Sequence, residues 1–254
     1  MCYPHINKLR GLLKMNRFSN LLREFNSLHG LSIAAIFFLA SCATVTSNVY
    51  HSSSSMTPPL SSKVLIFPPD AIVNLKNAGG SSEPRADWSE QVQSDLTDAL
   101  IGYMFENGIE AVPYGSNKLS DNHIDVLRQA TVMMDGVELS QRGGGIGSQR
   151  LYALSQNQLD KLEQFGADYL LIVALRSDVA SGGRQAVAVL GALAGAVVET
   201  SSAQFRAAVF DLRDGQLAWA NVDAQALSDI GNVVKADDAK WEKAIDHILS
   251  EFPL

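Results

Sequence analysis

The stretch YLLIVAL, residues 169–175, is a continuous apolar run that directly follows Gly166-Ala167-Asp168. A strand with one face in water alternates apolar and polar residues, whereas a strand covered on both faces is apolar throughout. The length of the run suits a single strand. We therefore predict that residues 169–175 form a central strand, and that helices cover both faces of the sheet around it.

Two further strands are predicted upstream of this central strand. VLIF at residues 64–67 is a short apolar run that stops at two prolines, residues 68–69, and is typical of a buried first strand. Residues 77–85 are rich in Gly, Ser and Pro and are expected to form a loop. Residues 109–112 give a weaker strand that ends at a proline.

A long helix is predicted between these two strands. Asp87 can cap its first turn, with Glu90 three residues later as in a capping box. Gly108 suits the position just past the end of a helix. The apolar residues of the segment recur at helical spacing, and they are Trp88, Val92, Leu96, Ala99, Leu100 and Tyr103.

Two shorter helices are expected before the central strand. Residues 124–134 carry apolar side chains at helical spacing, and residues 136–147 are expected to form a glycine-rich loop or hairpin tip. Ser155 and Gln158 form a capping box, and Gly166 is the stop signal of the helix that this box begins.

Downstream of the central strand the sequence indicates a hairpin and a last helix. Residues 204–212 and 217–224 are strand-like, and Asp214-Gly215 between them is a strong hairpin signal. The last helix has its apolar residues on one side, namely Trp241, Ala244, Ile245, Ile248, Leu249 and Phe252. The predicted order is β-α-β-α-α-β-β-β-α, which indicates an α/β (α+β) fold with a mixed sheet flanked by helices.

The N-terminal region has the three parts of a secretory signal. Basic residues come first, the apolar run of residues 31–40 follows, and small residues precede Cys42. Leu39-Ala40-Ser41-Cys42 resembles the bacterial lipobox, in which a peptidase cuts before the cysteine and the new N-terminus carries lipid. The apolar run is too short to span a bilayer, which needs about 20 residues. We expect a lipoprotein signal over residues 1–41, and a start at Met15 would preserve this arrangement.

Cysteine usage favours lipidation of Cys42 over an ordinary cleaved signal. Cys2 would be lost with the signal, which leaves Cys42 as the one cysteine of the mature chain. A single cysteine in a secreted protein needs an explanation, and an acyl chain such as palmitate supplies one. Residue 43 is alanine, whereas aspartate there favours inner-membrane retention in the lipoproteins that this motif resembles. The expected location is therefore the outer membrane, on its periplasmic face.

Composition divides the mature chain into a tether and one domain. Residues 42–62 are rich in Ser and Pro and are expected to form a flexible tether, whereas residues 63–254 can bury one core. Residues 1–41 hold five Lys or Arg and one Glu, so the net charge changes from −7 for the whole chain to −11 without them. An acidic chain is a poor nucleic-acid binder, because phosphate contacts need clustered Lys and Arg.

Two short sequence motifs around the predicted strands resemble those of an α/β family of envelope proteins. Gly166-Ala167-Asp168-Tyr169 before the central strand, and Phe210-Asp211-Leu212 before a tight turn into Trp219, carry this resemblance. The family includes the curli secretion channel lipoprotein, the lipoprotein activators of peptidoglycan synthases and the N-terminal domain of the Tol-Pal propeller protein. The sequence motifs FPPD at residues 67–70 and EPRADW at residues 83–88 also resemble those of uncharacterised proteobacterial lipoproteins.

The residues that could carry chemistry have plainer explanations. His51, His123 and His247 have no His or Cys at metal-ligand spacing, so each is expected to be a surface histidine and no metal or cofactor is expected. A G-x-S-x-G elbow is missing, and the glycines of residues 143–147 have no Lys-Ser/Thr to close a phosphate loop. Asp237-Asp238 suits a solvated helix start. These observations favour a protein that is not an enzyme.

Residues 186–198 are the most unusual segment, because they contain no charge between Arg184 and Glu199. As a helix the segment would be about 20 Å long, too short for a bilayer. It could be a buried small-residue helix or hairpin, a subunit contact, or a membrane-inserting element of the kind that the curli-channel resemblance implies. A barrel strand would alternate apolar and polar residues, and this segment does not. The interaction residues that we single out are Val187, Leu190, Gly191, Gly195 and Val197.

Three functional hypotheses remain open at this stage. The first is a lipid-anchored binding or assembly module without catalysis, held to the membrane through Cys42 and contacting an envelope protein. The second is an oligomeric secretion or pore component that self-associates through residues 186–198. The third is an envelope enzyme, which needs a cleft with shifted titratable groups.

Overall fold

The structure of the protein is a computed structural model. It describes residues 48–51, 62–143, 153–196, 198, 200–223, 230–249 and 252. The chain divides into two compact units, Met1–Val45 and Thr46–Leu254, and every described residue belongs to the second. The expected signal motif, Leu39, Ala40, Ser41 and Cys42, therefore lies outside the described residues.

The second unit is built on one mixed sheet of eight strands with β6 at its centre. The strand order is β1-β8-β7-β6-β2-β5, while β3 pairs with β6 and with β4. Pairing is antiparallel from β1 through β8 and β7 to β6, and parallel between β6 and both β2 and β3. The strands are β1 (Asn48–His51), β2 (Lys63–Ile66), β3 (Asp70–Lys76), β4 (Ser82–Pro84), β5 (Glu110–Pro113), β6 (Tyr169–Ala180), β7 (Ser202–Asp211) and β8 (Leu217–Asp223).

The prediction for the central strand is confirmed, and the strand is longer than predicted. All seven residues of YLLIVAL are buried, as a strand covered on both faces requires. Beyond them β6 continues to Ala180, and its burial then alternates. The second half pairs on one side with β3 and on the other with β7. Polar residues interrupt the apolar pattern in this half, so the apolar run alone does not mark the end of the strand.

Strands β2 and β3 pair one after the other with the same edge of β6, and the two prolines lie between them. Ile66 of β2 pairs with Leu171, and Asp70 of β3 pairs with Ala174. The four residue steps from the first of these pairs to the second therefore lie opposite three residue steps of β6. One extra residue on one strand is the defining feature of a β-bulge. Arg176 of β6 pairs with the Asp70 carboxylate and donates to its backbone carbonyl oxygen. The prolines fit here because a bulge does not need their missing N–H groups.

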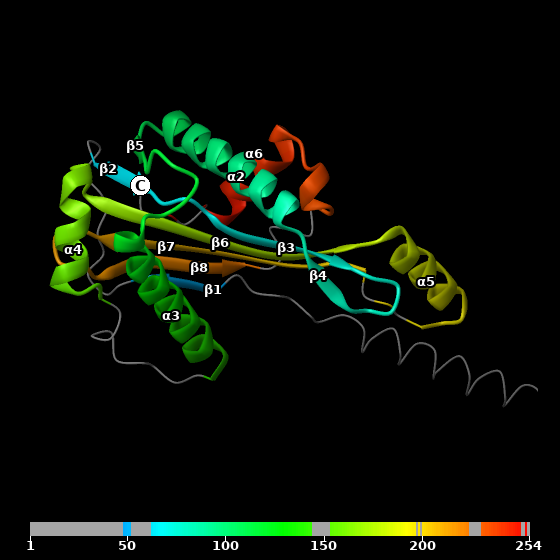
Figure 1. Ribbon diagram of the computed structural model, residues 1–254. Helices are drawn as coiled ribbons and strands as arrows, with labels where there is room; N and C mark the ends of the chain where they lie inside the picture. Colours follow the sequence, from blue (N-terminus) through cyan, green and yellow to red (C-terminus); the bar gives the residue numbers. More distant parts are fainter. Residues whose placement is uncertain are drawn as a thin grey trace, which may run out of the picture. The chain divides into compact units, whose positions relative to one another are not determined.

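Helices cover both faces of the sheet, as Figure 1 shows. On one face α2 and α6 pack over a core that includes Trp219 and Trp241, and on the other α3 and α4 pack over a core that includes Phe67 and Phe210. The expected α/β class, with helices flanking a mixed sheet, is confirmed. The described helices are α2 (Ala86–Glu106), α3 (Asp121–Gly143), α4 (Gln156–Leu162), α5 (Gly182–Leu193) and α6 (Asp238–Ile248), with short turns η2 (Glu163–Phe165) and η3 (Val233–Lys235).

Several local predictions are corrected. The loop expected at residues 77–85 contains β4, and the missed strand β3 precedes it. The loop expected at residues 136–147 is helical as far as Gly143, because Val137 is buried on the core-facing side of α3. Asp87 does not cap α2, since the helix begins at Ala86 and the Asp87 carboxylate binds Arg85 instead.

The structure places β1 inside the segment that was expected to be a tether. Asn48 pairs with Val222 and His51 with Trp219, which adds β1 to the edge of the sheet beside β8. Tyr50 is partly buried against the core on the α3 side. Part of residues 42–62 is therefore a strand, because one apolar contact and a free sheet edge outweigh the serine-rich composition of the neighbouring residues.

Candidate functional site

Helix α5 is the main candidate for an interaction surface. Along the chain it connects β6 to β7, and in Figure 1 it lies at the end of the long central strands. The Ser181 hydroxyl caps it by accepting a hydrogen bond from the Arg184 backbone N–H at 3.1 Å. Gly195, with φ +78°, follows its C-terminus in the left-handed conformation that commonly ends helices. Part of residues 186–198 is therefore helical, whereas the predicted element order had no helix between the central strand and the next strand.

None of the twelve residues of α5 is buried. Its exposed apolar face, which we call the α5 stripe, consists of Ala186, Val189, Leu190 and Leu193. These positions follow the i, i+3, i+4, i+7 spacing that normally faces a protein core. Here Val189, Leu190 and Leu193 are 63%, 66% and 82% exposed. The interpretation of this segment as a buried small-residue helix is therefore wrong, because the stripe faces outward.

The small residues of α5 serve close local approaches rather than a helix pair. A Cβ on Gly191 would lie 2.7 Å from Val198 Cγ2, so Gly191 makes room for the chain that returns from the helix. A Cβ on Gly183 would lie 3.3 Å from the Ala78 side chain in the β3–β4 turn. Gly191 and Gly195 were singled out as interaction residues, and in the structure they shape the end of α5 itself. Val187 is exposed at the margin of the stripe, and Val197 lies outside the described residues.

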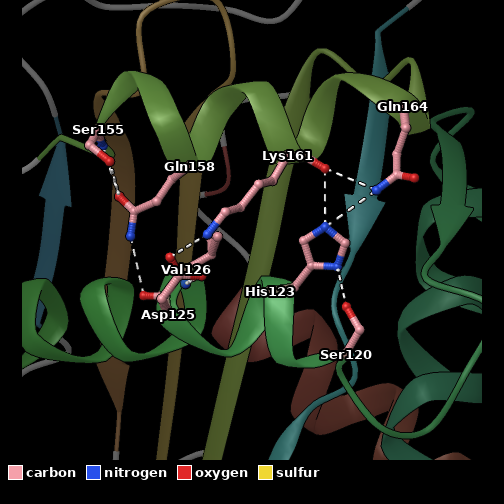
Figure 2. A network of polar contacts seen from close by, with 8 residues as sticks. All are labelled: Ser120, His123, Asp125, Val126, Ser155, Gln158, Lys161 and Gln164. Carbon is pink, nitrogen blue, oxygen red and sulfur yellow. Dashed lines mark hydrogen bonds and ion pairs between the residues drawn. The ribbon is translucent and has the colours of Figure 1, made fainter.

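A second candidate site is the polar network around His123, which Figure 2 shows. His123 is 4% exposed, so the expectation of a surface histidine is wrong. Its Nε2 donates to the Lys161 carbonyl oxygen at 3.0 Å, which leaves Nδ1 as an acceptor. The Tyr114 hydroxyl at 2.8 Å and the Ser120 hydroxyl at 3.1 Å both reach that Nδ1. The ring is thus held from α3, α4 and the loop after β5.

The contact between Ser120 and His123 invites comparison with a nucleophile and its base. Tyr114 competes for the same ring nitrogen at a shorter distance, and its hydroxyl also accepts the Ser120 backbone N–H at 3.0 Å. The aromatic rings of Phe67, Tyr114 and Phe165 surround the imidazole at centroid distances of 5.5 to 6.1 Å. The arrangement ties α3 to α4 and keeps the imidazole away from solvent.

The rest of this network supports the same structural role. The capping box at Ser155 is confirmed, and the Gln158 amide nitrogen goes on to donate to the Asp125 carbonyl oxygen at 3.2 Å. Lys161 Nζ lies 2.7 Å from Asp125 Oδ2. The Lys161 hydrogen bond is the main reason that the pKa of the Asp125 carboxyl lies below its ordinary value. Residues of α3 and α4 therefore hold each other through one histidine, one amide and one ion pair.

Two hollows flank α2. The larger has a volume of about 480 Å³ and lies between α2, α3 and the bulge, with Pro68, Pro69 and Leu119 among its lining residues. The smaller, about 350 Å³, lies between α2 and α6 and is lined by acidic residues that include Asp95, Asp98 and Asp238. Partial burial raises the pKa of the Asp95 carboxyl, and the charges of the two other aspartates raise it further.

The other residues that the sequence singled out have structural roles. Asp237 caps α6 by accepting a hydrogen bond from the Lys240 backbone N–H at 3.1 Å, as expected. His247 is exposed near the end of α6, and His51 lies in β1. Within the described part of the chain, His, Cys, Asp and Glu form no group of three that could hold a metal ion. Among the described helices, none is long and apolar enough to cross a membrane.

The comparisons with known proteins give similarity at the level of the chain fold. No protein-family model matches the sequence, and no curated protein matches it. The PelC dodecamer from Paraburkholderia phytofirmans is similar at 12% identity and a TM-score of 0.36, over 82% of this chain and 98% of that one.

Two other solved structures show similarity of the same kind. A single-substitution variant of the PelC dodecamer is similar at 11% identity and a TM-score of 0.37, over 81% of this chain and 96% of that one. The C-terminal domain of LpoB from Salmonella enterica is similar at 12% identity and a TM-score of 0.24, over 74% and 90% of the two chains. Likeness at these identities and TM-scores assigns no function to this chain.

Proposed function

We propose that this chain is a lipid-anchored cell-envelope protein that works as a non-catalytic binding and assembly module for another envelope component. The outward α5 stripe carries the proposal, because contiguous exposed apolar residues mark sites of contact with proteins or membranes. The lipobox-like motif that ends at Cys42 supplies the expected address, which is the periplasmic face of the outer membrane.

The use of the polar residues supports a role without catalysis. The His123 ring nitrogens are committed to Lys161, Tyr114 and Ser120, and the Asp125 carboxylate is committed to Lys161. These partners hold the ring and the carboxylate in place between α3 and α4, which supports a structural use of both groups.

A second candidate function is an oligomeric secretion or pore component of the outer membrane. The α5 stripe favours it too, since a second copy could cover the same apolar face. Size-exclusion chromatography of the detergent-solubilised protein distinguishes the two proposed functions, because elution as a monomer would contradict an oligomeric secretion or pore component.

Crosslinking in cells, followed by purification of the tagged protein at its endogenous level, tests the main proposal. We expect recovery of at least one other envelope component with the wild-type protein, and loss of that component with Cys42→Ser. Recovery of the tagged protein alone would contradict a binding or assembly role.

A further inference from the structure

The chemistry of the α5 stripe restricts what can cover it. No charged residue lies between Arg184 and Glu199, so the stripe offers an occupant apolar contact without ion pairs. Four side chains on one short helix also provide far less area than the roughly 800 Å² per partner of a standard protein interface. A free protein partner would gain little from the stripe alone. An occupant that is already held close by another link needs much less area, because its binding becomes intramolecular.

The start of β1 limits how far the proposed anchor can lie from the sheet. Cys42 precedes Asn48 by six residues. An extended chain covers at most about 3.3–3.6 Å per residue, so the α-carbon of Cys42 lies within about 20 Å of that of Asn48. The length of the intervening chain therefore limits how far the proposed point of lipid attachment can be from the start of β1.

Strand direction places this corner on the α5 side. Antiparallel pairing of β1 with β8, of β8 with β7 and of β7 with β6 makes β1 run opposite to β6. Since β6 runs toward α5, the chain enters β1 from the end of the sheet where α5 lies.

The pairing register also gives the distance along the sheet. Asn48 is level with Ala174, through Val222 of β8 and Arg206 of β7. Helix α5 follows Ala180, six residues further along β6, which is about 20 Å at the rise of a strand. Measured along the strand direction, a fully extended chain before β1 can therefore bring the anchor level with α5.

We propose that α5 lies on the surface of the bilayer that holds the Cys42 lipid, with Val189, Leu190 and Leu193 in the interfacial region. This inference rests on the proposed anchoring at Cys42. A twelve-residue helix is about 18 Å long and cannot span a bilayer, but it can lie in the plane of its interface. The contact orients the domain, with the α2 and α3 faces of the sheet standing beside the membrane rather than against it.

The membrane contact is expected to be insensitive to lipid charge. Surface helices that depend on anionic lipids carry several Lys or Arg on their polar face, whereas α5 contains Arg184 as its one charged residue. Added salt or anionic lipid should therefore leave the contact unchanged.

The test uses the lipidated protein in vesicles of phosphatidylcholine. The acylated Cys42 is the one cysteine expected in the mature chain, so Leu193→Cys provides a single thiol for a bimane label. Phe105→Cys is the matched control, since Phe105 is 83% exposed but lies near the end of α2, which leads to the opposite end of the sheet. We expect lipids with doxyl groups to quench the label at position 193 severalfold more strongly than the label at position 105.

Flotation of the vesicles on a density gradient separates the possible failures. Protein that does not float with the vesicles would overturn both the anchor and this inference. Protein that floats while its label at position 193 stays in water would overturn the inference alone. A blue-shifted label that doxyl lipids do not quench would also overturn it, because a second copy or another protein then covers α5.

A charged variant provides an independent readout of the same contact. Leu190→Glu should abolish the lipid quenching at position 193 and leave flotation unchanged, because a carboxylate opposes entry of α5 into the interface. Val132→Glu on α3 is the control, at a site that is 65% exposed and outside α5. Equal quenching in the two variants would contradict the inference.

Discussion

At the scale of single residues, two glycines separate the steric cost of adding a side chain from the cost of a left-handed backbone conformation. Gly215 lies in the β7–β8 turn with φ +75°, and a Cβ there would lie 2.7 Å from the Leu154 carbonyl oxygen. Gly166 has φ +58° but open space around it. We expect Gly166→Ala to lower the free energy of unfolding by about 1 kcal/mol, the cost of the left-handed conformation. Gly215→Ala should lower it by clearly more, because a backbone oxygen must also move, and equal losses in urea unfolding would contradict this account.

The ion pair of Asp125 and Lys161 predicts a dependence on pH. Lys161→Met removes the hydrogen bond that lowers the pKa of the Asp125 carboxyl, so this pKa should rise toward its ordinary value in an NMR titration. Because the folded-state pKa is lowered, the stabilisation is present above the ordinary aspartate pKa and is lost as the pH falls through the lowered value. Both side chains are partly exposed, so the gain at neutral pH is below about 1 kcal/mol. The same substitution at exposed Lys118 should leave the Asp125 pKa unchanged.

At the scale of elements, α5 and β6 should differ in stability although they are neighbours in sequence. None of the α5 residues is buried, whereas β6 forms the centre of the sheet. In solution without lipid, the α5 amides should therefore exchange by local opening, on the order of a hundredfold faster than those of β6. Gly195→Ala should speed α5 exchange further without changing the thermal midpoint. Equal protection of the two elements in a hydrogen-exchange experiment would contradict a peripheral α5.

Elements with their own local signals could be predicted from the sequence. The apolar run of β6, the capping box at Ser155 and the turn at Asp214-Gly215 each follow from residues close in the chain. Strands β1, β3 and β4 were missed because they lie beside polar, Gly, Ser or Pro residues. Pairing with distant strands stabilises β1 and β3, and β4 then pairs with β3 across a short turn.

The candidate sites depend on distant partners, and the sequence revealed less of them. The partners of the His123 ring come from Tyr114 and from Lys161, far apart in the chain, so spacing alone predicted a surface residue. Helical spacing within residues 186–198 was visible, but periodicity does not show whether a stripe faces the protein or the surroundings. The outward direction of the α5 stripe emerged with the sheet that carries it.

At the scale of the whole molecule, the anchor and the fold should be separable. Cys42 precedes the second compact unit, which contains both described cores. Cys42→Ser should therefore abolish metabolic labelling with palmitate and release the protein from the membrane fraction, while the thermal midpoint of the domain stays within about 1 °C, since the substitution lies outside those cores. Continued palmitate labelling of the variant would contradict the assignment of Cys42.

The edge strand β1 also sets how far the domain can lie from its proposed point of lipid attachment. While its four residues stay paired with β8, the domain can pivot only about 20 Å from the proposed attachment point. If β1 peeled away, the free chain would run from Cys42 to Lys63, and the same domain could swing about 70 Å from its membrane. The pairing of β1 with β8 is thus what keeps the domain at the shorter of these two distances.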